Sequence, residues 1–297
     1  MERNEYALKG YKIAVCEKYI CLLGERMVIC DREMHEVCTL PNLKSCVWVD
    51  FIDENLLIAR NAMRTYKIYD LNERLCVASH TALKSCYETF GLPVFDKKKG
   101  IIYDSFYRGQ FTRKEVTAFS VDTRTFQHIP FPQEGTIGTA SRINKDGHFQ
   151  TLWYTIRMEG GNCVLLPKIA TLTDDGFVIK TLQNPPELRI CYFTDTFCLT
   201  QLNDMMDLNS EARSKLNVPM ERQGYFCAAI NLEERGKIIL AYSDSICAMD
   251  LNTNTCLFFQ KEDYVSDIKL IGGDLFVGTK EKTIVYRNFA AEVLGES

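Results

Sequence analysis

The stretch KIYDLNERLCVAS, residues 67–79, consists of two short apolar runs on either side of the polar segment Asp-Leu-Asn-Glu-Arg. Asp and Asn are typical of tight turns, and an Asp side chain at the start of a turn accepts hydrogen bonds from the backbone. The stretch therefore predicts a β-hairpin whose first strand ends at Asp70. It contains no catalytic motif.

Near-copies of this stretch recur along the chain. Their turn position is occupied by Asp31, Asp70, Asp122, Asp174, Asp207 and Asp250, and in a weaker seventh copy by Arg287. The intervals range from 33 to 52 residues and average about 43, a period typical of propeller blades. Seven units of this size account for nearly the whole chain.

Two further strand-like runs precede each hairpin, most clearly CVWVDFID (46–53) and NLLIARNA (55–62) in the second unit. Few segments have the 3.6-residue apolar period of a helix, which argues against a helical solenoid. We therefore expect an all-β single domain over 1–297, a seven-bladed β-propeller of four-stranded antiparallel blades. The final unit has a poor fourth strand in FAAEVL (289–294), so residues 6–8 are expected to pair into the last blade and close the ring.

On these repeats, the chain resembles the β-propeller superfamily over nearly its whole length, in the broad manner of WD-repeat and related seven-bladed proteins. The resemblance is to the repeat and not to a named family, because the Trp-Asp ending of WD repeats is absent. Propellers include scaffolds, receptors and enzymes, so the resemblance implies the fold and leaves the function to be argued from the site.

The fifth unit departs from the pattern, because the polar run LNSEARSKLNVPMERQ (208–223) follows Asp207 where a fourth strand is expected. We expect a short helix here, with Asn209 or Ser210 as its cap and Pro219 beyond its end. A degenerate fifth blade leaves six blades as the alternative count.

Composition excludes several classes of function. The net charge of −4 and the pI of about 5.7 argue against binding to nucleic acid or an anionic membrane. No apolar run is long enough for a membrane span or a signal peptide. The 13 cysteines are odd in number, lack Cys-x2-Cys pairs and lie largely in apolar runs, so we expect reduced thiols, a cytoplasmic location, and neither metal nor cofactor.

No catalytic residue is predicted. The four histidines, His35, His80, His128 and His148, have no partner residue at a spacing typical of a catalytic or metal site. The sequence contains no nucleophile elbow, zinc-protease motif or phosphate loop. The alternative is a glycosidase- or lyase-like enzyme, or a small-ligand binder, with acids converging at the mouth of the central channel. Three or more acids and histidines in one pocket with perturbed pKa values would favour it.

Units three and four are each 52 residues long, and part of their excess lies in RGQFTRK (108–114), RMEGGN (157–162) and PQEGTIGTAS (132–141). In an up-and-down blade these connections emerge on one side of the ring. The predicted partner-binding residues are Arg108, Phe111, Arg113, Lys114, Glu134 and Arg157. The simpler interpretation of the long segments is a surface insertion that the fold tolerates. The functional interpretation is that the protein is a non-catalytic scaffold that binds protein partners through them.

Overall fold

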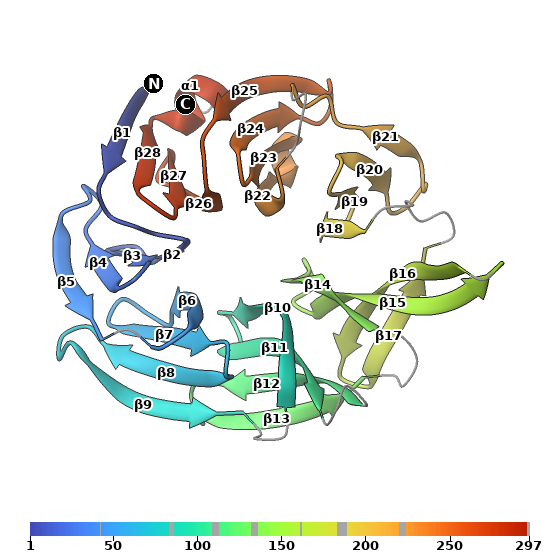
Figure 1. Ribbon diagram of the computed structural model, residues 1–297, viewed down its shortest axis with the longest axis horizontal. Helices are drawn as coiled ribbons and strands as arrows, with labels where there is room; N and C mark the ends of the chain where they lie inside the picture. The colour runs from blue at the N-terminus through green and yellow to red at the C-terminus, as the bar shows by residue number, and fades with distance from the viewer. Residues whose placement is uncertain are drawn as a thin grey trace.

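The computed structural model describes residues 1–41, 43–82, 86–108, 113–131, 136–160, 162–182, 189–219 and 224–295. Seven four-stranded antiparallel sheets surround a common axis as the blades of a β-propeller (Figure 1). The predicted all-β, seven-bladed architecture is confirmed, and six blades, the alternative count, is wrong.

The first four blades follow one another along the chain, each with its strands in sequence order from the axis outward. Blade 1 contains β2 (Lys12–Val15), β3 (Ile20–Leu23), β4 (Met27–Cys30) and β5 (Glu36–Leu40). Blade 2 contains β6 (Cys46–Phe51), β7 (Leu56–Asn61), β8 (Thr65–Asp70) and β9 (Leu75–Thr81). Blade 3 contains β10 (Cys86–Asp96), β11 (Ile101–Arg108), β12 (Arg113–Ser120) and β13 (Thr125–Pro130). Blade 4 contains β14 (Thr136–Ile143), β15 (Phe149–Glu159), β16 (Asn162–Thr173) and β17 (Gly176–Thr181).

The last three blades complete the ring. Blade 5 contains β18 (Ile190–Phe193), β19 (Phe197–Thr200), β20 (Asp204–Asp207) and β21 (Arg213–Lys215). Blade 6 contains β22 (Phe226–Leu232), β23 (Lys237–Tyr242), β24 (Ser245–Asp250) and β25 (Thr255–Lys261), with the 3₁₀ turn η1 (Glu233–Arg235) after β22. Blade 7 contains β26 (Val265–Ile271), β27 (Asp274–Thr279), β28 (Thr283–Arg287) and, from the N-terminus, β1 (Glu2–Tyr6).

The N-terminal strand closes the ring as predicted, although it lies earlier in the chain than residues 6–8. Strand β1 pairs antiparallel with β28, from Glu2 opposite Arg287 to Tyr6 opposite Thr283. FAAEVL forms the helix α1 (Phe289–Leu294), which packs Phe289, Ala290 and Leu294 into the core. The terminal strand thus covers the exposed edge of β28.

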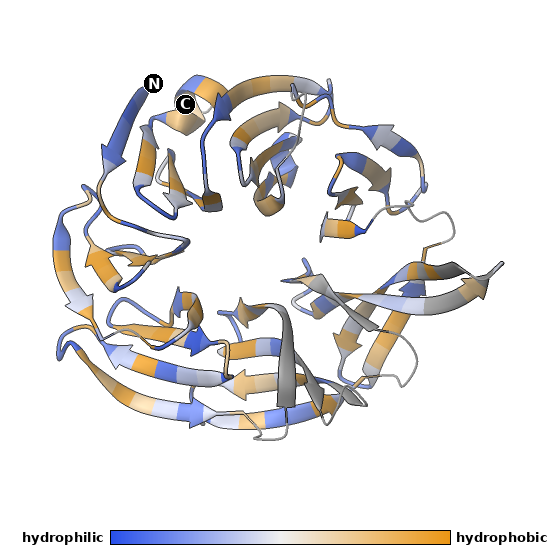
Figure 2. Ribbon diagram, viewed as in Figure 1, coloured by the Kyte–Doolittle hydropathy of each residue, from blue (hydrophilic) through white to orange (hydrophobic). Residues whose placement is uncertain are grey.

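Seven apolar layers, one between each pair of neighbouring blades, hold the ring together. Successive residues of a strand point to opposite sides of its sheet, so one strand serves two layers. In β23, Ile238 and Leu240 pack toward blade 5, whereas Ile239 and Ala241 pack toward blade 7. Apolar residues concentrate in the strands, while most turns are polar (Figure 2).

Cysteine contributes to several of these layers as a small apolar residue. Eleven cysteines in the described part of the chain are free thiols, among them Cys21, Cys46 and Cys198 in apolar layers. Burial raises the pKa of the Cys46 and Cys198 thiols to about 11, which keeps them protonated and unreactive at neutral pH.

One layer also contains a buried ion pair. Arg60 of blade 2 donates from Nε and Nη2 to the Asp104 carboxylate of blade 3, each at 2.8 Å, and both side chains are buried. The Tyr66 hydroxyl donates to the same carboxylate at 2.7 Å, and the Tyr66 ring stacks on Phe119 of blade 3. Burial raises the pKa of Tyr66 above its ordinary value, so the hydroxyl remains a donor. This cluster fixes blade 2 against blade 3.

The helix predicted in the fifth unit is wrong, because β21 forms a short fourth strand there and pairs with β20. The turn at Asp207 explains the difference. Its Oδ1 accepts from the backbone N–H groups of Asn209 and Ser210 at 2.9 and 2.7 Å, and Glu211 then adopts a positive φ of 56°. Because positive φ ends a right-handed helix, the chain reverses into a strand.

Candidate functional site

The propeller has two faces that differ in the connections they carry. One face carries the connections between second and third strands and those between successive blades, and we call it the upper face. The lower face carries the connections from first to second and from third to fourth strands. Antiparallel neighbours turn at alternate ends, so every turn of the chain falls on one of these two faces.

The lower face is built from the repeated turns found in the sequence. The Oδ1 atom of Asp70 accepts from the N–H groups of Asn72 and Glu73 at 2.8 and 3.1 Å, and Asp250 does the same with Asn252 and Thr253 at 2.9 and 3.0 Å. Hydrogen bonds from the backbone lower the pKa of Asp250 below its usual value. These aspartates are engaged in closing hairpins.

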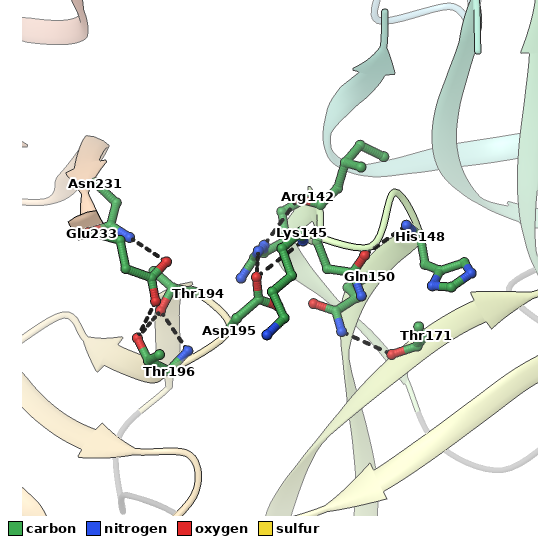
Figure 3. Close-up of polar contacts among 12 residues, drawn as sticks. Arg142, Lys145, His148, Gln150, Thr171, Thr194, Asp195, Thr196, Asn231 and Glu233 are labelled. Atoms are coloured by element: carbon green, nitrogen blue, oxygen red, sulfur yellow. Dashed lines mark hydrogen bonds and ion pairs between the residues drawn. The ribbon is translucent and has the colours of Figure 1, made fainter. Parts of the chain in front are cut away.

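A polar network joins three successive turns of the lower face, in blades 4, 5 and 6 (Figure 3). Arg142 donates to the Asp195 carboxylate at 2.6 Å, and the Lys145 backbone N–H reaches the same oxygen at 3.2 Å. Thr196 in turn donates to Glu233 at 2.8 Å. The network joins neighbouring blades through charges and hydroxyls. Its evident role is structural.

The upper face contains the residues predicted to bind a partner. Arg108 and Arg113 lie opposite each other at the end of the β11–β12 hairpin, and Lys114 pairs with Tyr107 one step below. Arg157 lies in β15, opposite Val164 of β16. Phe111 and Glu134 lie outside the described residues. The structure therefore brings Arg108, Arg113 and Lys114 to one hairpin end and places Arg157 in the next blade.

The excess length of units three and four takes a different form from the predicted loops. Strands β11 and β12 have 8 residues each, and β15 and β16 have 11 and 12, compared with 4 in each of β3, β4, β19 and β20. The long hairpin β15–β16 stays paired out to Glu159 opposite Asn162 and projects beyond the ring (Figure 1). The additional residues thus extend hairpins on the upper face.

Sequence analysis missed a second feature of the upper face, a set of exposed large apolar side chains. Tyr225 is 81% exposed and Met158 is 67% exposed, and the others are Met63, Leu202 and Tyr264. Four of them lie in upper-face connections, and Met158 lies in β15 one residue before its upper end. In the described turns of the lower face, no large apolar side chain is exposed to this degree.

Three of these residues, Leu202, Tyr225 and Tyr264, belong to connections that are bonded to one another; we call them the apolar trio. Gln201, next to Leu202, donates to the Gly224 carbonyl at 2.8 Å and accepts from the Phe226 N–H at 3.1 Å, on either side of Tyr225. The backbone of Ser243 then bonds both Tyr225 and Val265, which follows Tyr264. The trio therefore lies on a continuous framework across blades 5 to 7.

The central channel contains the largest of the described cavities, with a volume of about 620 Å³. It is lined from the inner strands β2, β10, β14, β18, β22 and β26, and it reaches the upper face at Arg189 and Gln201. A second cavity of about 380 Å³ shares Lys12, Asp267 and Lys269 with it and continues toward the lower face. The two cavities together follow the axis of the ring.

The larger cavity holds little that could perform acid–base catalysis. Among its described lining residues, Asp267 is the one carboxylate, and no histidine is present. Burial raises the pKa of Cys191 to about 12 and of Cys227 to about 11, so both thiols remain protonated at neutral pH. The convergence of acids and histidines that would favour an enzyme is not found in this part of the channel.

Two histidine–carboxylate pairs among the described residues lie apart from the channel. His35 Nδ1 is 3.1 Å from Asp31 in a turn of the lower face, and His128 Nδ1 is 2.8 Å from Glu115 in blade 3. Within the described ranges, no group of three or more His, Cys, Asp or Glu side chains is placed to hold a metal ion. No helix of the described chain has the length and apolar character needed to cross a bilayer.

A comparison with models of known protein families finds no match, and a comparison with curated protein sequences finds none either. The class of protein is therefore defined by the structure alone: this chain is a seven-bladed β-propeller.

Proposed function

We propose that this propeller is a non-catalytic interaction module that binds a protein partner on its upper face. The observation that carries the proposal is that the exposed large apolar side chains of the described connections lie on the upper face, namely Met63 and the apolar trio, with Met158 near the end of the β15–β16 hairpin. Exposed apolar side chains that gather on one face often mark an interaction site, and aromatic residues and methionine are enriched in interfaces.

The predicted basic residues support the same face. Arg108, Arg113 and Lys114 lie at the end of the β11–β12 hairpin, and Arg157 lies in the projecting β15–β16 hairpin. Arginine is common among the residues that dominate binding energy. Basic residues in hairpins of a face that also exposes apolar side chains suit a partner that offers acidic side chains around an apolar centre, and the free thiols are consistent with a cytoplasmic setting.

The test compares two triple variants that remove similar apolar surface from different places. One changes the apolar trio, Leu202→Ser, Tyr225→Ser and Tyr264→Ser. The matched control changes exposed apolar residues of the outer strands β9, β17 and β25, namely Leu75→Ser, Val178→Ser and Leu257→Ser. Tagged wild type and both variants are used to capture partners from the native host, with quantification by mass spectrometry.

A partner that binds through the trio is retained by the control and lost by the trio variant. Interface residues of this kind commonly contribute about 2 kcal/mol or more, which corresponds to roughly 30-fold weaker binding. A Phe111→Ala, Arg113→Ala variant, measured in parallel, tells whether blade 3 belongs to the same surface. The proposal fails if every captured protein binds wild type and trio variant equally, or depends on the outer strands instead.

A further inference from the structure

The central channel is more basic than the rest of the molecule. Three cationic residues line its larger cavity, Lys12 from β2, Lys269 from β26 and Arg189 just before β18. The whole chain has a formal charge of −4, so the lining of this cavity is positive although the chain as a whole is negative. A concave site with one sign of charge attracts oppositely charged solutes.

The single carboxylate of this cavity does not offset the three cations. Asp267 is buried, and its two oxygens accept from the backbone N–H groups of Ile13 and Ile268 at 2.9 and 3.0 Å. It thus ties β26 to β2, and it leaves the cavity with two more positive than negative side chains. None of the three cations has an ion-pair partner among the described residues.

The cavity toward the lower face differs in this respect, because its additional lysine is already paired. Lys97 Nζ is 2.8 Å from Asp50 Oδ1, so these two charges neutralise each other. Lys12, by contrast, donates to a neutral group, the Ser266 carbonyl, at 3.3 Å. An ammonium group has three donors, which leaves others for a ligand. Lys12 and Lys269 line both cavities, and Arg189 adds a third uncompensated positive charge to the larger one.

The rest of the wall is suited to the body of a small organic molecule. Tyr192 and Phe226, with ring centroids 6.1 Å apart, both line the cavity, together with Ile190, Pro93 and other apolar residues. The volume of about 620 Å³ falls within the usual range of ligand pockets. Such pockets typically combine apolar walls with a few polar groups that fix orientation.

We propose that the larger channel cavity binds a small organic dianion with an apolar body, either a phosphate monoester or a dicarboxylate. Lys12, Lys269 and Arg189 bind the anionic groups, and Tyr192 and Phe226 pack against the apolar part. Both anions present oxygen acceptors to ammonium and guanidinium donors. The inference rests on the charges and the apolar wall of the cavity and does not require the proposed partner binding on the upper face.

The test measures binding of phenyl phosphate, phthalate and the neutral probe benzamide to the whole protein by isothermal titration calorimetry. At least one dianion should bind, more weakly as salt is added, while benzamide should not. Lys12→Gln and Lys269→Gln should each weaken binding about tenfold or more, since a hydrogen bond to a charged group is lost. Lys269→Arg should retain binding because the charge remains.

The matched control is Lys9→Gln, which removes the same charge from a surface lysine paired with Glu25 at 2.7 Å. It should bind the dianion as the wild type does. Circular dichroism melting shows that each variant is folded, and the relative affinities for phenyl phosphate and phthalate decide between the two anions. If neither dianion binds the wild type, or if the channel variants bind as tightly as the Lys9 control, the inference is wrong.

Discussion

The two faces of this propeller are made from the same blades but follow different rules. On the lower face, one type of turn recurs, in which an Asp at the end of the third strand accepts backbone N–H groups, as at Asp70, Asp207 and Asp250. On the upper face, hairpins vary in length, and exposed apolar residues such as Tyr225 and Met158 occur. The lower face thus repeats one turn from blade to blade, and the variable upper face is the one that we propose binds a partner.

The difference has a physical origin in the turns. A side-chain carboxylate that satisfies two N–H groups specifies where a strand ends and where the next begins. The following positive φ, 56° at both Arg74 and Glu211 and 54° at Asn254, completes the reversal. Some upper-face hairpins use a related device, because Asn61 and Thr200 at the ends of second strands accept the N–H groups of Thr65 and Asp204 at 2.8 and 3.1 Å. In blades 3 and 4 the second and third strands instead stay paired for longer, so hairpin length varies on this face.

The first prediction concerns the packing between blades that supports both faces, and it has the largest expected effect. Asp104→Ala leaves the buried Arg60 guanidinium without its partner, so the free energy of unfolding should fall by about 3 to 5 kcal/mol in urea titrations. Replacing both residues, Arg60→Met with Asp104→Leu, should recover most of this loss because no unpaired charge remains.

The control for this effect is the Arg142–Asp195 pair of the lower face, at 2.6 Å, which is partly exposed to solvent. Asp195→Ala should cost about 1 kcal/mol or less, as is usual for ion pairs that water can reach. If Asp104→Ala and Asp195→Ala lower the free energy of unfolding equally, then burying the ion pair between blades 2 and 3 adds nothing to its contribution to stability.

The second prediction concerns the turns of the lower face and is of intermediate size. Asp207→Ala removes the acceptor for two backbone N–H groups, and we expect a loss of about 1 kcal/mol, as for a lost helix cap. Asp207→Asn keeps an acceptor oxygen and should retain most of the stability at pH 7. Urea titrations of the three proteins make the comparison.

The same turns predict a dependence on pH. Hydrogen bonds from the backbone N–H groups of Ser210 and Asn209 lower the pKa of Asp207 in the folded protein. A lowered pKa contributes stability that is present above the unfolded value, about 3.9, and is lost as the pH falls through the folded value. Asp207→Asn should therefore lose less stability than the wild type on acidification. An equal acid sensitivity of both proteins would contradict the turn model.

The fold was largely predictable from the sequence because its repeated signal is local. Asp31, Asp70, Asp174, Asp207 and Asp250 each lie at the end of a third strand or directly after it, as predicted. Asp122 lies two residues after the end of β12, where Ser120 accepts the Thr123 N–H at 3.3 Å in its place. The fifth blade shows the limit of local reasoning. Asn209 and Ser210 are good helix caps, but their N–H groups are taken by Asp207, and pairing with β20 favours a strand.

The candidate site was less predictable. From its composition, RGQFTRK is predicted to be a loop, whereas Arg108 and Arg113 are paired and extend a hairpin. The prediction is wrong because strand pairing depends on a neighbouring strand, which local composition does not reveal. The exposed apolar residues were missed for a related reason. A sequence pattern assigns Leu202 or Tyr225 to the core by default, and only the three-dimensional path of the connection places them in solvent.

The third prediction has the smallest expected effect on folding and distinguishes the faces most directly. Tyr225→Ser removes a side chain that is 81% exposed, so little packing is lost, and the free energy of unfolding should change by about 0.5 kcal/mol or less. The Tyr225 backbone keeps its hydrogen bonds with Ser243, which do not depend on the side chain. The matched substitution on the lower face is Asp207→Ala, which is also at a turn but should cost more. If Tyr225→Ser proves as destabilising as Asp207→Ala, then the Tyr225 ring stabilises the blade itself, and its exposure no longer argues for a partner on the upper face.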